Sequence, residues 1–204
     1  MPLIILDGSI ASLTLAWREA ASRPPVPASA KAGDEPFYIW VPAADSARLG
    51  DRALTIAQLC QATLLIEQPT EAWPLPSART GRAEASVLLF RAALVALERN
   101  CTRVIWPVHT TLADGLPAAA RAFDRGLILR ELLSLDAPDS PIAFEMPLLE
   151  LSDEAVADLA IDLGVPLQLA AFCRNSPAAA CTTCPSCRRW LTAAAAVGAS
   201  LHSL

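Results

Sequence analysis

Four cysteines near the C-terminal end of the chain have the residue type and spacing of a metal site. Cys173, Cys181, Cys184 and Cys187 follow the pattern C-x7-C-x2-C-x2-C. The two overlapping C-x2-C steps bend the backbone so that three sulfurs converge, and Cys173 can supply the fourth. Thiolates at this spacing suit a tetrahedral Zn²⁺ with zinc–sulfur distances of about 2.3 Å. Because four thiolates fill the coordination shell, the predicted zinc is structural and does no chemistry.

Two other interpretations of these cysteines stay open. Disulfide pairing fits less well, because overlapping C-x2-C steps cannot pair all four cysteines without strained short loops. Buried or redox-active cysteines are the second alternative. The remaining pair, Cys60 and Cys101, lies outside the pattern, and we expect both to be packed side chains.

A second candidate site lies at the start of the chain. The apolar run Leu3–Leu6 is typical of a buried strand, and it leads through a small polar turn into a helical pattern at Leu13–Ala21. A helix N-terminus after such a turn can bind an anion, because its free amides and its dipole point toward the ligand. A polar loop with Ser12 as the helix cap explains the same pattern without a ligand. The candidate nucleotide-binding residues are Asp7, Gly8, Ser9 and Ser12.

His109 follows the fourth apolar run, and Asp114 lies five residues further on. In a parallel sheet the carboxyl ends of the strands form the ligand-binding edge, so both residues are candidates for lining the cleft. His109 could act as an acid, a base or a ligand contact, or it could be a hydrogen-bonded structural histidine.

The elements that position these residues alternate between strand and helix. Such alternation predicts an α/β fold with a parallel sheet of about five strands covered by helices on both faces. We expect one Rossmann-like domain over residues 1–204, with the zinc-binding segment at 173–204. The expected strands are Leu3–Leu6, Phe37–Val41, Thr63–Ile66, Arg103–Val108, Ile142–Glu145 and a short Leu167–Leu169. The expected helices are Leu13–Ala21, Arg48–Ala62, Gly81–Asn100, Pro117–Leu133, one from Ser152 to Gly164, and Trp190–Ala199.

Composition narrows the class of protein. Hydrophobic residues make up 53% of the chain and charged residues 18%, which excludes a disordered polypeptide. The formal net charge of −5 argues against a nucleic-acid partner. The N-terminus lacks a signal-peptide pattern and no apolar run is long enough to span a membrane, so a reducing cytoplasm is the expected location.

With these motifs the chain resembles the 7-cyano-7-deazaguanine synthases of the PP-loop ATP pyrophosphatase superfamily. The strongest part is 147–187, where the cysteine pattern is similar to the family's structural zinc site. The resemblance implies the adenine nucleotide alpha hydrolase-like version of the Rossmann fold. It also implies that Arg79 is what remains of a Pro-x-Arg-Asn element and that Asp114 belongs to the substrate segment.

The phosphate loop departs from the family pattern Ser-Gly-Gly-x-Asp-Ser. Gly8 and Ser12 keep the pattern, whereas Asp7, Ser9 and Ala11 replace the first serine, the second glycine and the acidic residue. A carboxylate at position 7 repels phosphate, and Ser9 restricts a turn that glycine allows. We therefore expect weak or no ATP binding, unless Mg²⁺ bridges Asp7 to the phosphates.

The resemblance and these departures together predict a diverged member with lost or altered catalysis, serving as a ligand-binding or interaction module. The expected small-molecule partner is a deazapurine or a nucleotide, and the expected protein partner is a second copy or another protein. The alternative is an active ATP-dependent ligase. It would convert 7-carboxy-7-deazaguanine to the nitrile in queuosine and 7-deazapurine biosynthesis.

Overall fold

The first strand of the chain lies at the centre of the fold. In the computed structural model, β1 (Pro2–Ile5) is fully buried, because its aliphatic side chains pack on both faces of the sheet. Leu3 and Ile5 point to one face and Ile4 and Leu6 to the other, as the two-residue repeat of a strand requires. The structure describes residues 1–23, 37–68, 84–110, 115–139, 141–173 and 181–199.

Five parallel strands form one sheet in the order β3-β2-β1-β4-β5. The register pairs Ile4 with Ile39 of β2 on one side and with Ile105 of β4 on the other. The predicted parallel sheet of about five strands is therefore confirmed. The strands other than β1 are β2 (Tyr38–Val41), β3 (Thr63–Ile66), β4 (Arg103–Ile105) and β5 (Ala143–Glu145).

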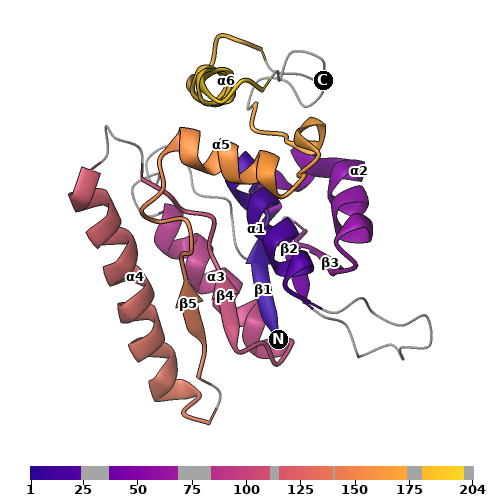
Figure 1. Cartoon of the computed structure of the whole chain (residues 1–204). Helices are drawn as coiled ribbons and strands as arrows, with labels where there is room; N and C mark the ends of the chain where they lie inside the picture. The colour runs from indigo at the N-terminus through magenta and orange to yellow at the C-terminus, as the bar shows by residue number, and fades with distance from the viewer. Residues whose placement is uncertain (24–36, 69–83, 111–114, 140, 174–180, 200–204) are drawn as a thin grey trace.

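Helices cover both faces of the sheet (Figure 1). One core contains side chains of α1, α2, α5 and α6, and the opposite core contains those of α3 and α4. α6 packs on α5, which packs on α1, so the cysteine-bearing end of the chain lies on the same face as α1. The helices are α1 (Ile10–Ala21), α2 (Ala43–Leu59), α3 (Glu84–Glu98), α4 (Gly115–Asp136), α5 (Asp153–Asp162) and α6 (Pro185–Ala196).

The prediction of a strand at Leu167–Leu169 is wrong. This segment is a single turn of 3₁₀ helix, in which the amides of Leu169 and Ala170 donate to the carbonyls of Pro166 and Leu167. Its short apolar run resembled a strand, but the preceding proline begins a local turn. Within the described ranges, no helix is long and apolar enough to cross a membrane.

The helices α1, α2 and α6 begin three or more residues before their predicted starts. α1 begins at Ile10 and Ser9 is its cap, because the Ser9 Oγ accepts a hydrogen bond from the Ser12 amide (3.2 Å). The predicted cap Ser12 already lies within the first turn. α6 begins at Pro185, well before Trp190, with Cys184 as its cap. α2 begins at Ala43, earlier than the predicted Arg48.

Candidate ligand pocket and metal centre

The structure brings the four predicted cysteines together. The Sγ atoms of Cys173, Cys181, Cys184 and Cys187 all lie within 4.8 Å of one another. The Cys181 and Cys187 sulfurs are 3.8 Å apart. A tetrahedron with metal–sulfur bonds of about 2.3 Å has edges of about 3.8 Å, so this donor set fits a tetrahedral metal ion.

Local hydrogen bonds favour the thiolate form of Cys181. Its sulfur accepts from the Thr183 Oγ1 (3.4 Å) and from the Cys184 amide (3.3 Å). These hydrogen bonds, that from Thr183 first, lower the pKa of Cys181 to about 5. Burial raises the pKa of Cys187 to about 12. A cation at the centre of the cluster would favour the ionised form of all four thiols, so the cluster could hold a metal ion.

A pocket of about 760 Å³ lies at the carboxyl edge of the sheet. It is bordered by the segments that follow β1, β2 and β4, and by α3 and α6. Asp7 and His109 both line it, so the loops after the first and fourth strands lie at the same edge, as predicted. Trp106, Phe172 and Trp190 form an apolar part of its wall.

Asp7 occupies the position at which an anion would bind the first loop. Its Oδ1 accepts from the Ser9 amide (2.9 Å) and from the Ser9 Oγ (2.6 Å). The Ser9 Oγ in turn accepts from the amide of Ser12. Ser12 itself is fully buried, and its hydroxyl donates to the carbonyl of Ser9 (2.9 Å). These polar groups of the loop are therefore satisfied within the protein.

Gly8 is held between α2 and the segment at Ala171. Its φ of +77° lies in the left-handed region, and its carbonyl accepts from the Ala171 amide (2.8 Å). A Cβ at this position would lie 2.8 Å from Arg48 Nη1 and 2.9 Å from Leu49 Cδ2. The loop thus has a structural requirement for glycine in addition to its resemblance to a phosphate loop.

Three arginines line the pocket, and each is paired with a carboxylate of the chain. Arg48 donates to Asp45 Oδ1 (2.5 Å) and to the Asp7 carbonyl. Arg91 forms an ion pair with Glu67, and Arg189 forms one with Asp153. None of these arginines lies close to the first loop in the sequence. The fold brings three to the pocket, but their charges are largely balanced within the protein.

His109 belongs to a small polar cluster at the pocket wall. Its Nε2 lies 2.8 Å from Asp153 Oδ1 and 2.7 Å from Arg189 Nη2. One nitrogen cannot donate to the carboxylate and accept from the guanidinium at once, so the two contacts correspond to alternative protonation states. The His109 ring also contacts the Trp190 ring at a tilt of 38°, with ring centroids 5.4 Å apart. His109 is therefore hydrogen-bonded, and its chemical role stays a prediction.

Asp153 connects this polar cluster to the cysteine-bearing helix α6. Burial acts to raise its pKa, but the hydrogen bonds and charge of Arg189, with a smaller contribution from His109, hold the pKa below its ordinary value. Arg189 lies on α6, two residues after Cys187, and Asp153 begins α5. The ion pair thus fastens the cysteine-bearing helix to the body of the domain.

Comparison with known protein families identifies the family of this chain. A family profile described as queuosine biosynthesis protein QueC matches residues 79–198, which is more than half of the chain. The chain belongs to the QueC family. The matched region includes the four cysteines and both helices that the Asp153–Arg189 ion pair joins.

A curated relative agrees with this assignment. The QueC-family chain is 29% identical over 102 residues to the 7-cyano-7-deazaguanine synthase of Campylobacter fetus subsp. fetus (strain 82-40). This match covers 50% of the chain and 45% of that relative's length. Among solved structures, the U34-tRNA thiolase NcsA from Methanococcus maripaludis with its 4Fe–4S cluster matches with a TM-score of 0.49 and 16% identity. That match covers 81% of this chain and 56% of that one.

Two of the predicted site residues, Arg79 and Asp114, lie outside the described residues. Sequence reasoning missed the charged residues that come from elsewhere in the fold, namely Arg48, Arg91, Asp153 and Arg189. Arg91 carried a signal, because it interrupts the longest apolar run of the chain. For Arg189 the only signal in the sequence is its position beside the cysteines.

We expect Arg189→Met to destabilise this QueC-family protein by about 1–3 kcal/mol, or about 2–12 °C in Tm. Methionine keeps an apolar stem near Trp190 but leaves Asp153, whose side chain is 12% exposed, without its main cation. The Arg189 side chain is 36% exposed, and solvent screening of its charge sets the lower end of the expected loss of stability. Thermal unfolding, with metal content measured in parallel, tests this expectation.

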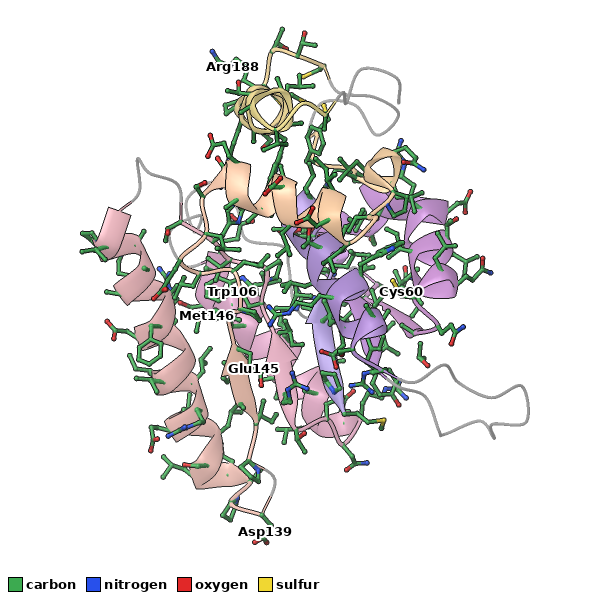
Figure 2. All side chains as sticks on the ribbon, viewed as in Figure 1. Cys60, Trp106, Asp139, Glu145, Met146 and Arg188 are labelled. Atoms are coloured by element: carbon green, nitrogen blue, oxygen red, sulfur yellow. The ribbon has the colours of Figure 1, made fainter. Side chains whose placement is uncertain are left out.

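Arg188→Met is the matched control. Arg188 is exposed on the same helix, and its side chain points away from the domain (Figure 2). This substitution should change stability by no more than about 0.5 kcal/mol. Equal effects of the two substitutions would show that the Asp153 ion pair does not fasten α6.

Proposed function

We propose that this chain is a diverged QueC-family protein that binds a small ligand in its pocket without activating it with ATP. A structural zinc held by the four cysteines stabilises the fold. The pairing of all three pocket arginines with internal carboxylates carries this proposal. A triphosphate needs unbalanced positive charge or oriented amides, and here the Ser9 amide is already bonded to Asp7.

The pocket is suited to a compact planar ligand. Trp106, Phe172 and Trp190 offer apolar surface, while His109 and Arg189 offer polar atoms at its border. Ligand sites commonly combine an apolar lining with a few convergent polar groups. A 7-deazapurine of the kind in the name of the curated relative fits this description, so 7-cyano-7-deazaguanine is the first ligand to test.

The second candidate function is the ATP-dependent ligase reaction of an active 7-cyano-7-deazaguanine synthase. The three arginines at the pocket favour it, because each could exchange its carboxylate partner for a phosphate. In this case Mg²⁺ would have to bridge Asp7 and the phosphates. The two candidates differ in whether ATP binds in the presence of Mg²⁺.

Calorimetric titration of ATP separates them. We expect no binding by the wild type up to about 1 mM, and a gain of at least tenfold in affinity for Asp7→Ser. The reason is that a carboxylate about 4 Å from one phosphate charge costs about 4 kcal/mol at an effective dielectric constant of 20. Repeating both titrations with Mg²⁺ tests the bridging alternative.

Asp51→Ser is the control, because Asp51 is exposed on α2 outside the pocket lining and carries the same charge. It should leave ATP binding unchanged. Sub-millimolar binding by the wild type without metal would contradict the proposal. Binding that appears only with Mg²⁺ would favour the ligase. A rise in Tm with 7-cyano-7-deazaguanine alone, and none with ATP, would support the ligand-binding function.

The identity of the metal is tested separately. A site of four thiolates suits zinc or an iron–sulfur cluster. We propose zinc, because it is the metal typical of a site in which four protein ligands surround a single ion. Metal analysis of protein purified without added metal should give close to one zinc per chain. Iron with acid-labile sulfide in its place would contradict the zinc assignment without affecting the ATP result.

A further inference from the structure

The lining of the pocket keeps negative charge that nothing nearby balances. Its three arginines are each neutralised by a carboxylate of the chain, as described above. The lining also contains Asp7 and Glu84, and neither of them forms an ion pair with a residue that the structure describes. A wall with this charge favours a ligand that donates hydrogen bonds over one that carries phosphates.

Asp7 is the better placed of these two carboxylates. Glu84 is exposed at the first position of α3, whereas Asp7 is partly buried and is held at two points. Its Oδ1 accepts from the amide (2.9 Å) and the hydroxyl (2.6 Å) of Ser9, and its backbone carbonyl accepts from Arg48. The carboxylate is therefore oriented before a ligand arrives, and such preorganisation lowers the entropic cost of binding.

One oxygen of the Asp7 carboxylate is left for a ligand. An ionised carboxylate has about four acceptor sites on its two oxygens. Oδ1 uses two of these sites for Ser9, whereas Oδ2 accepts no hydrogen bond from any residue in the described ranges. The acceptor sites that remain are therefore both on Oδ2. They match two adjacent N–H groups that point in the same direction, because such groups can converge on one oxygen.

The fold places Asp7 next to the aromatic part of the pocket wall. Asp7 and Trp106 follow the neighbouring parallel strands β1 and β4, in which Ile4 pairs with Ile105 (Figure 1). Neighbouring strands lie about 4.8 Å apart, so the residues that leave them at the carboxyl edge are close together. A planar ring that packs on the aromatic side chains can therefore present its edge to the carboxylate.

We propose that Asp7 binds the edge of a 7-deazapurine ring that carries a 2-amino group beside a protonated ring nitrogen, as in 7-deazaguanine. The two N–H groups of this edge converge on Asp7 Oδ2. An adenine-type ring presents an accepting nitrogen there, to which a carboxylate cannot donate. The same carboxylate repels a triphosphate, so one residue selects the guanine-type ring and excludes ATP. This inference rests on the proposed ligand-binding function and names the edge by which the ligand is recognised.

Calorimetry with 7-cyano-7-deazaguanine and with the same compound lacking its 2-amino group tests the proposal. The wild type should bind the first compound about 10–100-fold more tightly, because the second loses a hydrogen bond to a charged group. Asp7→Asn keeps an oxygen for Ser9 and places an N–H donor where Oδ2 lies. This variant should bind 7-cyano-7-deazaguanine at least about tenfold more weakly, and its affinities for the two compounds should agree within about threefold.

Asp51→Asn is the matched control, because it removes the same charge from an exposed residue outside the pocket lining. It should keep the wild-type preference for the 2-amino compound. The melting temperature of Asp7→Asn should stay within about 4 °C of the wild type, which shows that the loop is intact. Equal affinity of the wild type for the two compounds, or an unchanged preference in Asp7→Asn, would overturn the role of Asp7 and leave the ligand-binding function standing. Binding of neither compound would overturn the ligand-binding function and this inference with it.

Discussion

Replacing Cys184 with serine is expected to abolish stoichiometric metal binding and to lower the melting temperature by about 10 °C or more. Structural zinc sites in zinc-finger peptides contribute apparent binding energies of about 10–16 kcal/mol, and this energy is largely folding energy. Loss of even a third of it corresponds to about 3–5 kcal/mol, at about 2–4 °C per kcal/mol for a domain of this size.

Serine is the informative substitution at this position. Cys184 is also the N-cap of α6, where its sulfur accepts from the Cys187 amide (3.4 Å). Serine is among the best N-cap residues, so it keeps the cap and removes the metal ligand. The loss of stability can then be assigned to the metal.

The metal should also determine the shape of the ligand pocket. Cys173 directly follows Phe172, and Cys187 lies between Ser186 and Arg189, so the metal would tie together two segments of the pocket wall. We therefore expect the Cys184→Ser protein to lose its ligand together with its metal.

Cys101→Ser is the control for this experiment. Cys101 is buried in the opposite core and lies outside the cluster. This substitution can cost stability through the buried hydroxyl, but it should leave the metal content unchanged. If Cys184→Ser had the melting temperature of the wild type, or if Cys101→Ser lost its metal as well, the structural metal site would be refuted.

A second large effect is expected for Gly8→Ala, which should destabilise the protein by about 2–5 kcal/mol. An L-residue in the left-handed region costs about 1–2 kcal/mol, and overpacking adds about 1–3 kcal/mol. The added methyl group would also lie 3.1 Å from the carbonyl oxygen of Ala171, which belongs to the backbone and cannot move aside easily. Denaturant unfolding at constant metal concentration measures the change.

Gly164→Ala separates the two contributions. Gly164 has a similar φ of +65°, but an added Cβ would meet no atom within 4 Å. It should therefore cost only the backbone term of about 1–2 kcal/mol. Equal losses for the two variants would show that the contacts of Gly8 with Arg48, Leu49 and Ala171 do not constrain the loop.

The sequence by itself determined the features that depend on nearby residues or on a repeated pattern. The cluster of four cysteines was identified from their spacing, because all four lie within fifteen consecutive residues. The order of strands and helices was predicted from apolar periodicity, because each element must bury a face or a stripe of its own. The parallel sheet then followed from the alternation of the elements.

Element boundaries were predicted less well. More than one neighbouring residue can cap a helix, and the local backbone geometry decides which of them does. Ser9 and Ser12 are both good cap residues, and the backbone at Ser9 is the extended one. At Cys184 a residue type that is uncommon as a cap begins the helix, because the cysteine turn already orients its sulfur toward the Cys187 amide.

Only the tertiary structure decided the electrostatics of the pocket. Arg48 contacts Asp7 across 41 residues, Arg91 pairs with Glu67 across 24, and Arg189 reaches Asp153 across 36 and His109 across 80. No local pattern specifies such partners, because they meet only when the sheet and its helices have packed. The sequence did not show which charged residues would lie near the first loop. The fold brings Arg48, Arg91 and Arg189 to the pocket and pairs each of them with a carboxylate of the same chain.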